Sequence, residues 1–220
     1  MKKLFLLLLI SYNTAWASCN ELYPDSKPIE PKDTIELCNT FYVVRYDPIA
    51  MTPILTSERL DPKKPIGELN RLGTFKADDR IRNSIKPSEY TNSGYDRGHM
   101  VPSDDASTKE EMLSTFLTTN STPQNPKLNQ GPWRILEEKV RKLAKSSKEP
   151  VYILTISVYG QKPPYFGRLI VPSGYWKVLV KKPAKNELFS NVAWFAPNLP
   201  GATVTEHRNV DISKISNTLD

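Results

Sequence analysis

The stretch GYDRGHM, residues 94–100, places one of the chain's 2 histidines two positions after an arginine. A neutral imidazole can accept a proton from water, and a guanidinium can bind two oxygens of a phosphate group at once. Because the charge of Arg97 opposes protonation of His99, the pair favours an imidazole that stays neutral near pH 7. Residues two apart in a strand share a face, so we expect Arg97 and His99 to project together, with Asp96 and Gly98 facing away. The pattern predicts phosphate-ester chemistry with His99 as general base, although a histidine beside an arginine can also be purely structural.

Strands and helices must position this pair. Alternating β-branched and aromatic residues predict strands in residues 40–48, 151–160, 167–172, 175–182 and 187–197, and His99 falls at the end of another strand. Pro172, Ser173 and Gly174 are expected to form the turn of a hairpin. Strands that precede and follow a helical middle describe an α+β fold.

Two helices are predicted between these strands. A capping-box pattern at residues 107–110 starts the first helix, whose apolar face is formed by Met112, Leu113, Phe116 and Leu117. Pro132 suits the first turn of the second, longer helix, whose buried side is formed by Trp133, Leu136, Val140 and Leu143.

Composition indicates a globular protein with a basic surface. The 220 residues are 39% hydrophobic, which suits one domain with a sizeable core. The formal net charge of +6 becomes 6 − 2 = +4 once Lys2 and Lys3 are removed. Mild basicity suits a polyanionic partner such as DNA or RNA, but solvated helix ends produce the same charge.

The first 17 residues have the three parts of a secretory signal peptide. Lys2 and Lys3 precede an apolar run over residues 4–10, and Ala15-Trp16-Ala17 offers a cleavage site. The run is too short to span a bilayer, so we expect no membrane insertion after cleavage. The sequence therefore predicts a secreted or periplasmic protein with a single domain at residues 18–220.

The chain has 2 cysteines, Cys19 and Cys38. An oxidising compartment would allow them to form a disulfide that closes a short loop. Lipid attachment at Cys19 is the alternative, but Trp16 stands where a lipoprotein signal usually has leucine. The cysteines are far in sequence from His99, which argues against a zinc site and against a cysteine nucleophile.

The motif DRGH at residues 96–99, with the asparagine of LNQGPW 30 positions after its histidine, resembles the secreted DNA/RNA non-specific endonucleases. The similarity continues through CNTFYVVRYD, TTNSTPQ, VPSGYWKVLV and EHRNVDISKI, so it covers most of the chain. It implies the ββα-metal nuclease fold, in which helices pack on a central antiparallel sheet. It also implies hydrolysis of DNA and RNA with little sequence preference.

The resemblance also implies roles for individual residues. His99 would be the general base, and Asn129 the direct protein ligand of a magnesium ion. Glu137 would lie near the waters of the metal, and Arg97 would contact the phosphate. Magnesium prefers six oxygen ligands and keeps its waters, so one amide oxygen suffices when water and phosphate supply the rest; Mn²⁺ could replace it. From the residues alone, Asn129 equally suits the start of a helix, and Glu137 suits a first helical turn.

Further residues matter to substrate binding. Asn120 and Gln124 correspond to scaffold or phosphate contacts in the family. Gly73 stands near the place of a family arginine, so Arg71, Arg80 or Arg82 is expected to replace it, and we include Arg80 among the substrate-binding residues. Ile156 and Ser157 replace a Gly-Pro pair, which would alter one wall of the site.

Two other functions remain open. An exported nucleic-acid-binding protein with the same fold and little or no cleavage is the main alternative, and a phosphodiesterase for small nucleotides is the other. The second histidine, His207, lies in no motif and is expected at the surface.

Overall fold

The computed structural model describes residues 19–181, 191–208 and 210–211. The expected signal peptide lies outside the described residues, as do residues 187–190 at the start of the last predicted strand. In the described part of the chain, none of the helices combines the length and apolarity needed to cross a bilayer. The domain boundaries at residues 18–220 stay a prediction.

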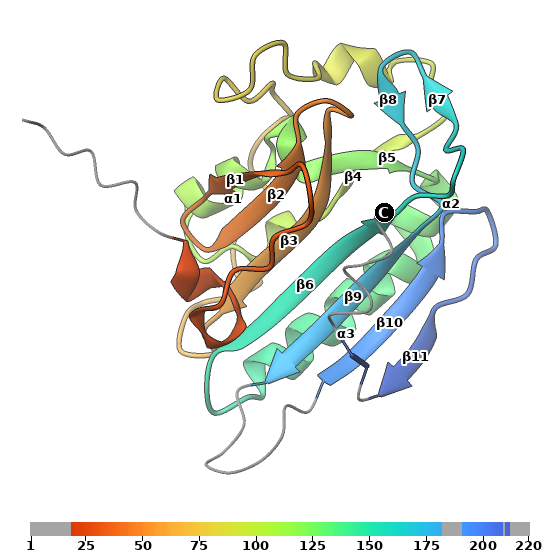
Figure 1. The fold of residues 1–220 in the computed structure, drawn as a ribbon. Coiled ribbons are helices and arrows are strands. Elements are labelled where there is room, and N and C mark those ends of the chain that lie inside the picture. The colour runs from red at the N-terminus through yellow and green to blue at the C-terminus, as the bar shows by residue number, and fades with distance from the viewer. Residues whose placement is uncertain (1–18, 182–190, 209, 212–220) are drawn as a thin grey trace, which may run out of the picture.

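An antiparallel sheet of seven strands is the base of the fold in the described residues (Figure 1). Its strand order is β1-β2-β3-β6-β9-β10-β11. The strands are β1 (Ile35–Cys38), β2 (Tyr42–Asp47), β3 (Thr52–Leu60), β6 (Val151–Val158), β9 (Gly174–Lys181), β10 (Asn191–Pro197) and β11 (Thr205–Arg208).

Smaller elements surround this sheet. Two antiparallel pairs join β4 (Asp96–His99) to β5 (Ser121–Gln124) and β7 (Tyr165–Phe166) to β8 (Leu169–Ile170). The helices are α1 (Lys109–Thr115), α2 (Pro126–Leu128), the π-helical turn η6 (Asn129–Trp133) and α3 (Arg134–Lys145). Short 3₁₀ turns are η1 (Asn20–Leu22), η2 (Pro24–Ser26), η3 (Pro87–Tyr90), η4 (Ser103–Asp105) and η5 (Thr118–Asn120).

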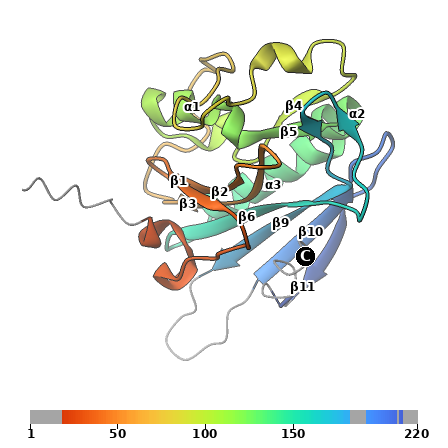
Figure 2. The same cartoon turned by 45° about the horizontal axis from the view of Figure 1, so that its top comes forward.

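The helices and the β4–β5 pair cover one face of the large sheet (Figure 2). Leu136 and Val140 from α3 and Trp133 from η6 are buried in a core that they share with Ile153 and Leu179 of the sheet. Burying a side chain of this size contributes about 1.5–3 kcal/mol, so this interface holds α3 firmly against the strands.

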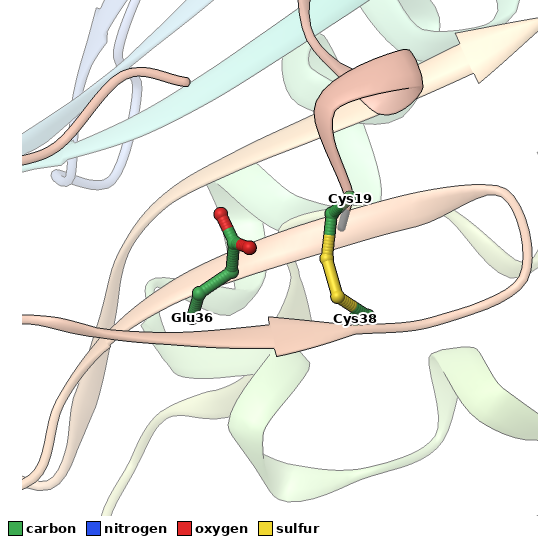
Figure 3. Close-up of side chains that lie close together, drawn as sticks. All are labelled: Cys19, Glu36 and Cys38. Carbon is green, nitrogen blue, oxygen red and sulfur yellow. A yellow bond between two sulfur atoms is a disulfide. The ribbon is translucent and has the colours of Figure 1, made fainter. Parts of the chain in front are cut away.

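The opposite face of the sheet is covered by the start of the described chain. Leu22 and Tyr23 belong to a second buried cluster with Val43 of β2 and Leu55 of β3, and the hydroxyl of Ser57 in β3 donates a hydrogen bond to the Leu22 carbonyl. The predicted disulfide is present between Cys19 and Cys38, next to Glu36 (Figure 3). The Tyr23 hydroxyl donates a hydrogen bond to the Glu36 carboxylate at 2.8 Å. The disulfide therefore fastens η1 and η2 to β1.

One connection between neighbouring strands carries α1, β4, β5, α2, η6 and α3. It runs over residues 61–150, between β3 and β6, which are paired in the sheet. Leu60 at the end of β3 is the register partner of Val151 at the start of β6. The two ends of this long connection therefore meet at one place on the sheet.

The structure confirms the α+β class and corrects several local predictions. The side chain of Thr108, one residue later than the start of the predicted capping box, accepts the hydrogen bond from the Glu111 backbone N–H. Leu113, which was predicted on the apolar face, is 43% exposed. Met112 of α1 and Phe116, the residue that follows α1, are buried in the core instead.

The predicted hairpin at residues 172–174 is wrong. β8 pairs with β7, whereas β9 pairs with β6 and β10. Ser173 instead donates its backbone N–H to Val158 at the end of β6, so the chain turns directly into the large sheet.

Candidate active site

A cavity of about 470 Å³ lies between β4 and the start of α3. Every side chain that lines it comes from residues 71–141, inside the connection between β3 and β6. The structure brings four sequence-predicted residues together here: Arg97, His99, Asn129 and Glu137. The lining also contains the guanidinium groups of Arg71, Arg134 and Arg141. The acidic residues of the lining are Asp96, Asp104, Glu137 and Glu138, so the cavity offers guanidinium groups to a phosphate and carboxylates to a cation or to water.

His99 is the last residue of β4 and packs against two phenyl rings, which also contact each other. The ring centroids of Phe75 and Phe116 are 4.7 and 5.1 Å from that of the imidazole. The guanidinium of Arg97 lies over the Phe75 ring, and that of Arg71 over the Phe116 ring. Burial, followed by the charges of Arg71 and Arg97, lowers the pKa of His99 to about 3. The imidazole is therefore neutral at pH 7.

The two ring nitrogens of His99 differ. Nε2 is completely covered and has no hydrogen-bond partner among the described residues. Nδ1 is thus the nitrogen that can meet a water molecule in the cavity. The rings of Phe75 and Phe116 pack against the imidazole and limit its freedom to rotate.

Asn129 reaches the cavity from the π-helical turn η6. Its Nδ2 donates a hydrogen bond to Asp96 Oδ2 at 2.8 Å, and Gln130 Nε2 donates to the same oxygen at 2.8 Å. A carboxylate only accepts hydrogen bonds, so Asp96 fixes which end of the Asn129 amide faces it. The carbonyl oxygen Oδ1 receives no hydrogen bond from any described group, and it is the end that remains for a ligand.

Asp96 is the residue that the sequence analysis misplaced. We expected it to face away from His99, yet it lines the same cavity. Alternation fails here because Asp96 is the first residue of β4, and the amides of Asn129 and Gln130 hold its carboxylate toward η6. Its place inside the DRGH motif was a signal for a role in the site.

Glu137 lies in the first turn of α3, as the sequence predicted. Burial raises its pKa to about 7, while the charge of Lys177 opposes this rise. Arg141, one turn further along α3, pairs with Asp105 at 2.5 Å. Glu137 therefore lines the cavity with a carboxyl group that titrates near neutral pH.

Three expected substrate contacts lie outside the cavity lining. Asn120 is fully buried; its amide nitrogen donates to the backbone carbonyls of Val101 and Thr115, and its oxygen accepts from the Val101 N–H. These bonds use the whole amide, which favours the scaffold role. Arg80 also has other partners, since it pairs with Asp78 at 2.7 Å.

Gln124 is 1% exposed and packs against Gly98. A Cβ atom at Gly98 would lie 2.2 Å from Gln124 Oε1, so only glycine fits between Arg97 and His99. Gln124 therefore supports β4 from behind and does not reach the cavity.

Arg71 is the candidate for the missing family arginine that the structure brings to the cavity. Gly73 has φ of +125°, and a Cβ atom there would lie 2.6 Å from Phe116. A side chain at position 73 is thus excluded by Phe116. The guanidinium of Arg71, two residues earlier, lies over the ring of Phe116. Ser157 stands where the family has the proline of its Gly-Pro pair. Its hydroxyl donates a hydrogen bond to the sulfur of Met100, the residue that follows His99 in the sequence.

The donor set fits a hard divalent cation. Asn129 Oδ1 and the Glu137 carboxylate are oxygen donors, and no cysteine lines the cavity. Oxygen ligands with room for water are the preference of Mg²⁺. In the described residues, a trio of acidic, histidine or cysteine ligands close enough to share a metal occurs at Cys19, Glu36 and Cys38, where the sulfurs are already bonded to each other.

The β4–β5 pair followed by α3, packed on an antiparallel sheet, defines the ββα-metal nuclease fold. A solved structure of the EndoG/EndoGI complex shares this fold with a TM-score of 0.72, at 23% identity over 86% of this chain and 84% of that chain. The chain belongs to the DNA/RNA non-specific endonuclease family, whose sequence profile matches residues 20–218.

Named relatives are nucleases from bacteria and animals. The chain is 37% identical to a nuclease of Nostoc sp. over 119 residues, which cover 52% of this chain and 43% of the relative. It is 29% identical to the mitochondrial nuclease EXOG of Danio rerio over 177 residues, which cover 73% of this chain and 52% of the relative. The chain thus spans about half the length of the curated relatives it matches.

Proposed function

We propose that this protein is a magnesium-dependent endonuclease that hydrolyses phosphodiester bonds of DNA and RNA with little sequence preference. The observation that carries the proposal is the convergence of a neutral His99 and the free amide oxygen of Asn129 on one arginine-lined cavity. Family membership supports the same reaction class.

His99 acts as the general base. Its Nδ1 takes a proton from a water molecule as that water attacks the phosphorus atom. The bond from phosphorus to the 3′ oxygen breaks and the departing 3′ oxygen takes a proton from a second water molecule, which leaves a 5′-phosphate and a 3′-hydroxyl. Arg97 and Arg71, whose guanidinium groups lie over the Phe75 and Phe116 rings, bind the non-bridging phosphate oxygens.

Substrate binding would also tune the base. The charges of Arg71 and Arg97 help to hold the pKa of His99 at about 3 in the free protein. A bound phosphate brings negative charge to both guanidiniums and therefore raises this pKa. The imidazole becomes more basic when the substrate is in place, which suits a proton acceptor working near neutral pH.

Asn129 would hold the magnesium ion through Oδ1, and Asp96 keeps that oxygen turned toward the cavity. A bound magnesium ion supplies positive charge that stabilises the departing 3′ oxygen. Glu137 faces the same space and accepts hydrogen bonds from water when ionised. The cavity lining offers phosphate-binding groups, and contacts to phosphate carry no sequence information, which supports a broad substrate range.

We further propose that the protein acts outside the cytosol, in the periplasm or after secretion. The disulfide between Cys19 and Cys38 supports this, because such bonds persist in oxidising compartments.

Digestion assays test the function directly. Plasmid, linear duplex DNA, single-stranded DNA and RNA are incubated with the mature protein in Mg²⁺ or EDTA, beside His99→Ala and Asn129→Ala. The matched control is His207→Ala, which removes the exposed second histidine. We expect cleavage of all four polymers in Mg²⁺ only, a loss of about 10²–10⁴-fold for His99→Ala, and full activity for the control.

Two results would count against the proposal. Tight binding of polynucleotides without cleavage in Mg²⁺ would favour the binding-protein alternative. Undiminished cleavage by folded His99→Ala would remove the imidazole from the reaction.

A further inference from the structure

Two neighbouring aromatic side chains are exposed to water in the hairpin of β7 and β8. Tyr165 is 62% exposed and Phe166 is 39% exposed, and in the described part of the chain no other aromatic side chain is classed as exposed. Successive residues of a strand point to opposite faces, so neither face of the hairpin is covered at β7. Adjacent apolar rings left in water are typical of a binding surface.

The hairpin holds these rings in a fixed place. Phe166 pairs with Leu169, so the two residues between them form a tight turn. Arg168 of this turn donates hydrogen bonds to both carboxylate oxygens of Glu89, at 2.8 and 2.5 Å. It also donates to the backbone carbonyl of Asn83 at 2.9 Å. Because the rings are already held in position, a ligand that binds them has little ordering entropy to overcome.

The short turn η3 connects the hairpin to the cavity. Arg97 of the cavity donates a hydrogen bond to the Pro87 carbonyl at 3.2 Å, and Arg168 binds Glu89 two residues later. Each residue of a 3₁₀ helix rises by about 2 Å, so the two guanidinium groups lie within roughly 15 Å of each other. β8 also contacts β5, the partner of β4 (Figure 1). Stacked nucleotides are about 3.4 Å apart along one strand, so about four of them span this gap.

The surface around the hairpin is basic. Residues 82–90 and 161–170 contain four basic side chains and one acidic side chain, and the acidic one, Glu89, is paired with Arg168. The other basic side chains of these segments are exposed: Arg82, Lys86 and Lys162. Cations bind phosphates and aromatic rings stack on bases, so the surface matches a polynucleotide. Paired bases in a duplex already stack on one another, whereas an unpaired base can stack on a side chain.

We propose that Tyr165 and Phe166 form a second nucleic-acid contact, which stacks on an unpaired base of the strand held in the cavity. The exposed cations around the hairpin bind phosphates of the same strand. The contact favours single-stranded DNA and RNA over duplex. This inference rests on the proposed function in taking a polynucleotide as the ligand, but it concerns binding and not cleavage.

The test is fluorescence anisotropy with the mature protein in EDTA. The ligands are a labelled oligothymidylate and a labelled duplex of the same length. Tyr165→Ala/Phe166→Ala should weaken binding of the single strand about 5-fold or more relative to the duplex, which is the loss expected for one stacked base. Tyr165→Trp/Phe166→Trp should retain the affinity, whereas Tyr165→Leu/Phe166→Leu, which is apolar but not aromatic, should lose it. The matched control is Leu113→Ala, which removes a 43% exposed apolar side chain of α1.

Circular dichroism establishes that each variant is folded, and the leucine variant decides if the alanine variant does not fold. Unchanged binding of the single strand by either folded variant overturns the proposal. An equal loss for single strand and duplex also overturns it, because stacking on unpaired bases predicts a difference. Sedimentation tests the competing role of the rings as an interface between two copies. A dimer that dissociates in the alanine variant, with unchanged single-strand affinity, would establish that role instead.

Activity separates this inference from the proposed function. In Mg²⁺, the alanine variant should raise the KM for single-stranded DNA about 5-fold or more relative to the KM for duplex DNA. Binding that depends on the two rings, in a protein that cleaves nothing, supports the second contact and refutes the proposed function. Cleavage by the unaltered protein, with an unchanged KM ratio in the variant, supports the proposed function and overturns the second contact.

Discussion

The low pKa of His99 predicts a specific loss of stability in acid. The unfolded chain binds a proton at this imidazole near pH 6.5, whereas burial and two arginines delay binding in the folded protein until about pH 3. The unfolded state therefore binds more protons than the folded state throughout this window. The contribution of His99 to the unfolding free energy is present above pH 6.5 and is lost as the pH falls. Between pH 6.5 and 4.5 this single group should cost about 2 kcal/mol of unfolding free energy.

Urea denaturation of the unaltered protein and of His99→Leu at both pH values measures this effect. Leucine is apolar, can pack against Phe75 and Phe116, and does not titrate. The other titratable groups contribute equally to the pH dependence of the unfolding free energy of both proteins. The unaltered protein should lose about 2 kcal/mol more than the variant. The His207→Ala protein offers a direct check, because the chain has 2 histidines and only one imidazole signal then remains in the NMR spectrum.

The reasoning fails if that remaining imidazole titrates at pH 6 or above. It also fails if both proteins lose stability in parallel between pH 6.5 and 4.5. Either result would mean that solvent reaches His99 more freely than the two phenyl rings suggest.

Three further predictions follow from the site and the disulfide. Asp96→Asn should raise the Mg²⁺ concentration for half-maximal cleavage about 10-fold or more, because the Asn129 amide, the proposed metal ligand, loses its fixed orientation. An unchanged dependence of cleavage on Mg²⁺ concentration would contradict this. Gly98→Ala should cost about 1–3 kcal/mol in urea denaturation, and Gly98→Ala/Gln124→Gly should recover part of the loss, because glycine also removes the Gln124 Cβ that lies 2.4 Å from the added methyl group. Reducing the disulfide, whose cysteines are 19 positions apart, should lower the unfolding free energy by about 3 kcal/mol; an identical urea midpoint with and without reductant would disprove a stabilising role.

Periodicity and local chemistry were sufficient for the strands and helices that have one clear buried side. The stripe of Leu136 and Val140 predicted α3, and the strand pattern predicted most of β9 and all of β10. β3 escaped notice because it is buried on both faces and contains Pro53 and Glu58, so it shows neither alternation nor a purely apolar run. The pairing of β8 depends on contacts distant in sequence, which a turn motif alone does not encode.

The candidate site was predictable as far as its motifs reach. DRGH and LNQG identified His99 and Asn129, whose meeting in one cavity needs η6 to pack beside β4. The hydrogen bond from Asn129 to Asp96 depends on that packing and overrides strand alternation. Lys177 interrupts an apolar strand, but nothing in the local sequence indicates that its buried ammonium donates a hydrogen bond to Thr155.

The connection from Leu60 to Val151 leaves the sheet and returns to it at neighbouring positions. This connecting segment supplies all the residues that line the cavity, and it also supplies the helices that cover one face of the sheet. The residues that line the cavity and the helices that cover the sheet thus belong to one continuous segment of the chain. Engineering of this protein should therefore exchange residues 61–150 as a unit. The sheet residues that face this segment should be redesigned at the same time.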